Sequence, residues 1–248
     1  MNRLRQARNQ RRRGSQQTLP ASGVGLYAAW NNARMAIRDA PRPVEFVVVI
    51  LIAFGLFTYW AFMLFFQPPE NDAVTNQELV VLFMYELVAF GVIACFLRIR
   101  GWQLRKFYTR ITWKLTGVGI LLATVITLYG IGVGLVGEQA GWSNEPEAEA
   151  VSVSLPIAVI FSVANGIYEE SLVVGYVIGV LRWCGCGVAI MVSTMIRVAY
   201  HVYQGPDALL IILPIGVLLG YVFYRSRRLW PLVLAHALLN FISLIFES

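Results

Sequence analysis

Long apolar stretches constrain this chain more than any other feature of its sequence. They lie at about residues 44–66, 79–98, 111–136, 153–181, 186–204, 207–224 and 229–246. A helix needs ~20 mostly apolar residues to cross a bilayer, and most of these stretches reach that length. Only 14% of the residues are charged, against about 25% in soluble domains. The sequence therefore predicts an all-α polytopic membrane protein with about seven (seven to eight) transmembrane helices.

The first 43 residues differ in kind from the rest of the chain. They carry nine arginines and one acidic residue in a Gln-rich, polar context, which cannot bury a core. We interpret residues 1–43 as a basic cytoplasmic tail that anchors the topology. The alternative is contact with anionic lipid or nucleic acid, and we expect no nucleic acid partner. Residues 24–40 are compatible with an amphipathic surface helix that ends before Pro41.

The connections between the apolar stretches alternate in charge. QPPENDAVTNQE and EQAGWSNEPEAEA are acidic, whereas RIRGWQLRKFYTR and RSRR are basic. Because cytoplasmic loops carry the excess of Lys and Arg, the N-terminus is expected in the cytoplasm. We therefore expect a multi-pass protein of the cell membrane, with the bilayer as a partner.

Glycine and cysteine patterns indicate how the helices pack and turn. Three pairs of glycines stand four residues apart, a spacing that lets helices approach closely in lipid: Gly130 and Gly134, Gly175 and Gly179, and Gly216 and Gly220. The run Cys184-Gly185-Cys186 predicts a tight connection rather than a metal site.

Two adjacent carboxylates stand inside an apolar run, in NGIYEESLVVGY. A charge at membrane depth costs several kcal/mol, so Glu169 and Glu170 mark a functional hypothesis. Asn165 stands one turn before Glu169, and the second apolar stretch adds Glu86. The two adjacent glutamates predict a site inside the helical bundle.

The chain has two histidines, and both lie within apolar stretches. On a helix, His236 shares a face with Asn240, four residues later, and His201 shares a face with Arg197, four residues earlier. A hairpin at residue 185 puts Glu169 and His201 each ~24 Å from the turn, at similar depth. A straight last helix, in contrast, puts His236 nearer the inner face.

These residues, in this order, resemble the CPBP intramembrane proteases, also called the CAAX-protease or Abi family, which include the Rce1-type prenyl-protein endopeptidases. The resemblance covers about residues 150–246, as a catalytic core after the N-terminal transmembrane helices of residues 44–137. Two positions depart from the family pattern: Val174 replaces the usual arginine, and Arg197 replaces the usual phenylalanine. We hypothesise that Arg197 supplies the missing charge from the neighbouring helix.

The resemblance implies an intramembrane endopeptidase that hydrolyses a peptide bond of a membrane-associated protein or peptide. Glu169 would be the base and His201 its partner in holding water. His236 and Asn240 would be oxyanion donors, with Glu170 in support and Arg197 as the charge partner.

Three alternatives remain at this point. A catalytic zinc could be held by Glu169, His201 and His236, but no His-Glu-xx-His motif is present, so we expect no cofactor. The chain could also be a non-catalytic membrane scaffold or a bacteriocin-immunity-type protein. A proton-coupled transporter is the third alternative, because acids and histidines in membranes also relay protons.

Overall fold

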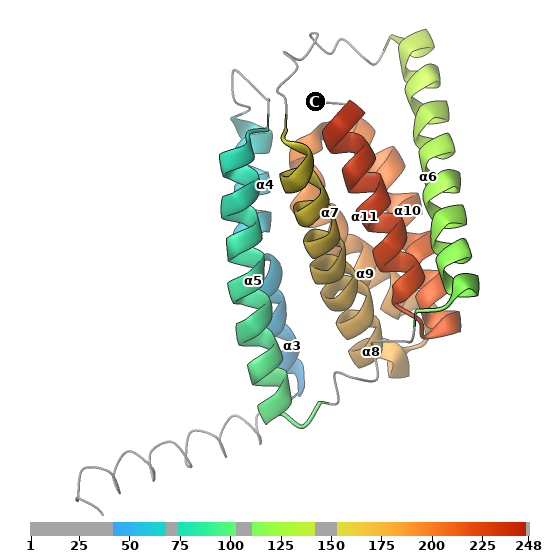
Figure 1. Ribbon diagram of the computed structural model, residues 1–248. Helices are drawn as coiled ribbons and strands as arrows, with labels where there is room; N and C mark the ends of the chain where they lie inside the picture. Colours follow the sequence, from blue (N-terminus) through green and yellow to red (C-terminus); the bar gives the residue numbers. More distant parts are fainter. Residues whose placement is uncertain (1–41, 68–73, 103–110, 142–152, 247–248) are drawn as a thin grey trace, which may run out of the picture.

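The structure is a computed structural model that describes residues 42–67, 74–102, 111–141 and 153–246 (Figure 1). Nearly all of the predicted basic tail, including the predicted helix at 24–40, lies outside the described residues. The division of the chain into a tail, N-terminal helices and a catalytic core stays a prediction.

Every regular element in the described ranges is helical. The first stretch joins α3 (Arg42–Ile50), a π-helical segment (Leu51–Gly55) and α4 (Leu56–Phe66). It is followed by α5 (Asn76–Ile99) and α6 (Trp113–Ala140). A long stretch then joins α7 (Leu155–Glu169), a second π-helical segment (Glu170–Tyr176), α8 (Val177–Leu181) and a 3₁₀ turn (Arg182–Cys184). The chain ends with α9 (Cys186–His201), a 3₁₀ turn (Val202–Gln204), α10 (Gly205–Ser226) and α11 (Trp230–Phe246).

Six of the described helical stretches are long and apolar enough to cross a membrane, and α11 is a shorter apolar helix. The predicted all-α polytopic class is therefore confirmed, and the helix bounds lie within a few residues of the predicted ones. The last helix is the marginal one, because its 17 residues span only ~25 Å of a hydrocarbon layer of ~30 Å.

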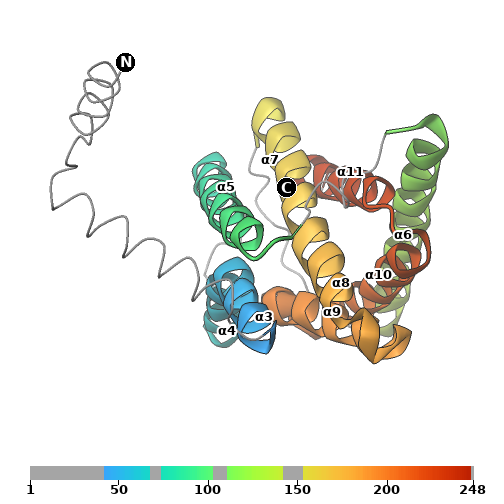
Figure 2. The ribbon, with the colours of Figure 1, turned by 90° about the horizontal axis from the view of Figure 1, so that it is seen from below.

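The helix α7 and its continuation through α8 form the centre of the bundle. Figure 2 shows them between α3, α4 and α5 on one side and α6, α10 and α11 on the other. Of the 18 consecutive residues that are most apolar in the Leu155–Cys184 stretch, 56% are buried inside the bundle, against 22% in α5 and in α6. Residues of α7 are thus the ones that neighbouring helices can reach from several directions.

Glycines set the closest helix contacts, although only some of the predicted ones do so. A Cβ on Gly216 would lie 2.8 Å from Thr194 Cγ2, and one on Gly220 would lie 3.1 Å from Ile190 Cγ2. This pair therefore lets α10 pack on α9, as predicted. A Cβ on Gly130 or Gly134, in contrast, would meet nothing within 4 Å, so the prediction for that pair is wrong within the described residues.

The α6 helix approaches α11 at a different glycine. A Cβ on Gly119 would lie 2.9 Å from the Pro231 carbonyl oxygen, and Trp230 Nε1 donates to Thr116 Oγ1 at 3.0 Å nearby. The four-residue spacing of Gly130 and Gly134 predicted a helix contact there, because spacing alone does not tell where along α6 the partner helix begins.

The two π-helical segments leave backbone carbonyls available to side chains of other helices. Tyr85 donates its hydroxyl to the Ile52 carbonyl at 2.9 Å, and Tyr168 donates to the Ala53 carbonyl at 2.7 Å. In the second segment, Ser193 Oγ donates to the Val173 carbonyl at 2.7 Å. A π-turn weakens the regular backbone ladder, and these hydroxyls satisfy the carbonyls that it exposes.

The connection between α8 and α9 is the predicted tight turn. Gly185 has a φ of 95°, in the region that favours glycine, and the Gly185 N–H donates to the Arg182 carbonyl. The cysteines on either side of it are free. The turn folds α9 back along α8 and α7, which gives the hairpin its predicted pairing in depth.

Candidate active site

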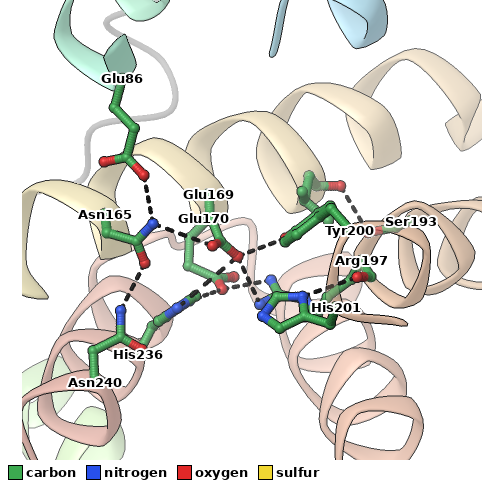
Figure 3. A network of polar contacts seen from close by, with 11 residues as sticks. Glu86, Asn165, Glu169, Glu170, Ser193, Arg197, Tyr200, His201, His236 and Asn240 are labelled. Atoms are coloured by element: carbon green, nitrogen blue, oxygen red, sulfur yellow. Dashed lines mark hydrogen bonds and ion pairs between the residues drawn. The ribbon is translucent and has the colours of Figure 1, made fainter. Parts of the chain in front are cut away.

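The two adjacent glutamates lie where α7 passes into its π-helical segment, and both reach the same guanidinium. Glu170 Oε1 lies 2.6 Å from Arg197 Nη2, and Glu169 Oε2 lies 3.4 Å from Arg197 Nη1 (Figure 3). All three residues are buried, with Glu170 at 0% exposure. Arg197 thus bridges from α9 to both carboxylates, in the position that the sequence hypothesis gave it, while Val174 is buried in the apolar core.

His236 of α11 joins the same cluster from a third helix. Its Nδ1 lies 2.7 Å from Glu170 Oε1, and its Nε2 lies 4.0 Å from Glu169 Oε2. The carboxylate can only accept, so the Nδ1–H of His236 donates to Glu170. This hydrogen bond fixes the plane of the ring and turns its other nitrogen toward Glu169.

The depth of His236 differs from that expected for a straight last helix, near the inner face, because the ring lies level with Glu170. A Cβ on Gly175 would lie 3.3 Å from Leu229 Cδ1, so the residue before α11 packs against the C-terminal end of the π-helical segment Glu170–Tyr176. Gly175 stands ten residues before the turn at Gly185, and α11 therefore begins ~15 Å above that turn. From this higher start, seven residues bring His236 level with Glu170.

His201 lies at the end of α9, beside the cluster. Its Nδ1 lies 3.0 Å from the carbonyl oxygen of Arg197, so Nδ1–H donates and the neutral ring keeps Nε2 as an acceptor. The His201 ring contacts the Tyr200 ring, with centroids 4.5 Å apart. Figure 3 shows the His201 ring beside Arg197, and its one hydrogen bond among the described residues is to the Arg197 carbonyl.

Asn240 reaches Glu169 through an intermediate amide. Asn240 Nδ2 donates to Asn165 Oδ1 at 2.6 Å, and Asn165 Nδ2 donates to Glu169 Oε1 at 3.2 Å. The same Asn165 Nδ2 donates to Glu86 Oε1 of α5 at 2.6 Å. The sequence noted Asn165 and Glu86 as polar residues in apolar stretches, but it did not place either at the site.

Tyr200 is a site residue that the sequence analysis missed. Its hydroxyl donates to Glu169 Oε2 at 2.5 Å, and its ring stacks on Phe54 with centroids 4.9 Å apart. A tyrosine next to a histidine in an apolar helix carries no signal of its own in one sequence. Asn165, by contrast, shares a helix face with Glu169, and that spacing could have identified it.

The arrangement combines an acid–base group with fixed hydrogen-bond donors. Glu169 accepts from Tyr200 on one oxygen and from Asn165 on the other, while Arg197 and His236 lie within 4.0 Å of it. Two carboxylates face a single guanidinium, so this cluster holds one more acid than arginine. Such a surplus carboxylate, held by directed donors, is suited to taking up and returning a proton.

The donor set of this cluster is not arranged as a metal site in the part of the chain that the structure describes. Among the described residues, no group of three or more His, Cys, Asp or Glu side chains is arranged to hold a metal ion. His236 uses Nδ1 on Glu170, and Glu169 has hydrogen bonds on both oxygens. Glu169, His201 and His236 thus do not form a ready zinc site as they stand, and a reaction without a cofactor stays a prediction.

Comparison with known families agrees with the position of this cluster. Residues 151–242 match the family model described as type II CAAX prenyl endopeptidase Rce1-like. The match includes both glutamates, Arg197, both histidines and Asn240, and it leaves out α3 to α6. No curated protein and no solved structure gave a match.

Proposed function

We propose that the chain is a CAAX-type intramembrane protease that hydrolyses a peptide bond with a water molecule activated by Glu169, since residues 151–242 match the Rce1-like family model. The observation that supports this most is the meeting of Glu169, Glu170, Arg197 and His236 from three helices at one buried point. The substrate class is a membrane-associated protein or peptide, because the site lies within the bundle.

In the first step Glu169 takes a proton from water while the water oxygen attacks the scissile carbonyl carbon. His201 orients the same water, since its Nε2 is the ring nitrogen that can accept a hydrogen bond. Tyr200 and Asn165 hold the carboxylate of Glu169 in one orientation from either side. A base fixed in this way needs little reorganisation when the proton moves.

The negative charge that forms on the carbonyl oxygen is stabilised by donors from α11. Asn240 uses one N–H of its amide on Asn165, so its second N–H is available for the oxyanion. His236 donates Nδ1–H to Glu170, so it supplies an Nε2 donor only when the ring is doubly protonated.

In the second step the protonated Glu169 returns its proton to the leaving amine as the carbon–nitrogen bond breaks. No side chain forms a covalent intermediate with the substrate. Glu170 and Arg197 stay outside the proton transfers: they hold each other, and Glu170 sets the plane of His236. The general acid–base contribution of Glu169 is expected at about 10²- to 10⁴-fold.

The experiment is a comparison of membrane and secreted peptides between cells that carry the natural chain and cells that carry Glu169→Gln. A cleaved fragment that disappears only in the variant would name substrate and activity together. Glu138→Gln, an exposed charge at the end of α6, is the matched control and should leave the fragment unchanged.

A different outcome would support another function. A scaffold or immunity-type protein should keep its cellular effect in Glu169→Gln, and a proton-coupled transporter should show altered flux with no cleaved product. Either result would overturn the protease proposal. The cytoplasmic N-terminus and the cell membrane as location rest on the charge of the tail and loops, and reporter fusions at residue 1 and in the 67–75 loop would test them.

A further inference from the structure

Glu86 is a buried carboxylate that the proposed mechanism does not use. It lies on α5, outside the residues that match the family, and it is 3% exposed. Its Oε1 accepts from Asn165 Nδ2 at 2.6 Å, which is shorter than the 3.2 Å between that nitrogen and Glu169 Oε1. The stronger partner of Asn165 is therefore a residue of the N-terminal half of the chain.

The amide of Asn165 has one orientation that fits its neighbours. Its Nδ2 faces two carboxylates, Glu86 and Glu169, and its Oδ1 faces the Nδ2 of Asn240 (Figure 3). A flipped amide would set its oxygen against both carboxylates and its nitrogen against the nitrogen of Asn240. Because a carboxyl oxygen that carries no proton accepts and does not donate, Glu86 Oε1 acts together with Glu169 to make the flipped state unfavourable.

The orientation of Asn165 then decides which end of Asn240 faces the reaction. With Asn165 Oδ1 accepting from Asn240 Nδ2, the amide nitrogen of Asn240 lies on the side of Asn165 and Glu169, and its second N–H remains for an oxyanion. If Asn165 were flipped, Asn240 would turn its carbonyl oxygen to this side. An acceptor in that place would repel the developing negative charge.

From these contacts we propose that Glu86 is a positioning residue that acts through Asn165 to orient both the Glu169 base and the Asn240 oxyanion donor. This inference rests on the proposed hydrolytic function for its effect on rate. It assigns to α5 a part in the site that neither the matched segment nor the helix pattern of α5 indicates. The chain of contacts is Glu86, Asn165 and then Glu169 and Asn240.

The contact environment of Glu86 also provides the conservative variant. Its second oxygen, Oε2, has no hydrogen-bond partner in the part of the chain that the structure describes. In Glu86→Gln the amide oxygen can therefore take the place of Oε1 against Asn165, and the NH₂ group can take the place of Oε2. Glu86→Leu keeps the approximate volume but removes the acceptor.

The activity experiment measures kcat and KM for the natural chain and its variants on a peptide that is cleaved in a Glu169-dependent way. Glu86→Leu is expected to lower kcat about 10- to 100-fold with KM within about twofold, as for a displaced reacting group. Glu86→Gln should recover kcat to within about threefold. Tyr85→Phe, which removes a neighbouring α5 hydrogen bond to Ile52, is the control for loosened helix packing and should leave kcat unchanged.

A double substitution separates the relay from a merely structural role. If Glu86 acts through Asn165, Glu86→Leu should lower kcat no further in a chain that already carries Asn165→Leu. Three outcomes would each overturn the inference. In the first, the effects of Glu86→Leu and Asn165→Leu on kcat multiply in the double variant. In the others, Glu86→Gln is as slow as Glu86→Leu, or Glu86→Leu keeps the kcat of the natural chain.

A second readout does not depend on turnover. In protein labelled with ¹⁵N at asparagine, the side-chain amide signal of Asn240, assigned by its loss in Asn240→Leu, should shift in Glu86→Leu and in Asn165→Leu. It should stay in place in Glu86→Gln and in Tyr85→Phe. An unmoved signal in Glu86→Leu overturns the inference even if no substrate is cleaved. Absence of Glu169-dependent cleavage with the signal moved would instead overturn the proposed function alone.

Discussion

Two clusters of buried charged side chains lie in the same helix bundle, and positive and negative groups are balanced to different degrees in the two. The Glu45 cluster consists of Glu45, Arg100, Trp102 and Tyr176. It joins the start of α3 to the chain at the end of α5 and to the second π-helical segment, Glu170–Tyr176. Glu45 Oε2 accepts from Arg100 Nε, and Oε1 accepts from Trp102 Nε1 at 2.9 Å and from Tyr176 at 3.4 Å. One acid meets one base, and both of its oxygens are satisfied.

The Glu169 cluster (Glu169, Glu170, Arg197, His236) is balanced less completely. Two acids share one arginine, and two polar atoms, Glu170 Oε2 and Arg197 Nε, have no hydrogen-bond partner among the described residues. The comparison teaches that burial of an ion pair is a poor marker of function, since both clusters are buried. A surplus carboxylate with titratable neighbours distinguishes the candidate active site from the structural pair.

The largest expected effect separates the two clusters by activity. Glu169→Gln should lower the rate of peptide cleavage about 10²- to 10⁴-fold, because the amide cannot take a proton from water. Glu45→Gln, at equal burial, should leave the rate per folded molecule within about threefold, since Glu45 touches no residue of the proposed mechanism. Cleavage by purified protein in detergent or liposomes, followed by mass spectrometry, measures both. Equal losses in the two variants would erase the distinction.

Substitutions at Arg197 and Val174 test whether the arginine of the Glu169 cluster can be supplied from another position. Arg197→Phe leaves two buried carboxylates without their guanidinium and should lower cleavage about 100-fold, with a loss of about 3–5 kcal/mol in stability. Adding Val174→Arg restores the cation from the α7 side and should recover at least tenfold of the lost rate. A double variant as inactive as Arg197→Phe would refute this exchange.

The effects on the free energy of unfolding should be in the opposite order to the effects on activity, with Glu45→Gln the more destabilising of the two substitutions. Glu45→Gln leaves Arg100 beside a neutral amide, which should lower the free energy of unfolding by about 3 kcal/mol. Glu169→Gln removes a surplus negative charge, and Arg197 keeps Glu170, so the change should stay within about 1 kcal/mol. Thermal unfolding in detergent, compared under one condition, measures the difference. A more destabilising Glu169→Gln would mean that the second cluster is the structural one.

The smallest expected effect concerns metal. If Glu169 acts on water directly, treatment with a chelator should change the cleavage rate by less than about twofold, and added Zn²⁺ should not increase it. The control is Glu169→Gln, which should stay inactive with and without Zn²⁺. Loss of activity with the chelator, restored by Zn²⁺, would favour a metal held by Glu169, His201 and His236 in a rearranged site.

The number of helices could be predicted from the apolar stretches, the α8–α9 turn from the glycine between two cysteines, and the level of Arg197 by counting residues from that turn. The hairpin at Gly185 fixes the pairing of α7 with α9 by simple counting, and the ion pairs of Arg197 follow from it. His236 could not be placed in this way. Its depth depends on Leu229 packing against Gly175, a contact between segments more than fifty residues apart in the sequence.

The supporting partners of the site were the least predictable part. Tyr200 and Glu86 reach Glu169 and Asn165 only because α9 and α5 pack on α7 in particular rotations. Neither rotation has a periodic signature in an apolar helix, because residues facing lipid and residues facing protein are both hydrophobic. The same reason explains why Gly130 and Gly134 were assigned to a helix contact that the described residues do not make.

The π-helical segment Glu170–Tyr176 has a consequence for how this chain tolerates change in length. A π-turn holds one residue more than an α-turn, so removal of one residue between 171 and 175 would let the helix close into regular α-form. The wide turn has absorbed that residue, so the faces on either side would keep their relative orientation after the deletion. A one-residue deletion elsewhere in α7 has no wide turn to absorb it, and it would rotate Asn165 and Glu169 by ~100° relative to Tyr176.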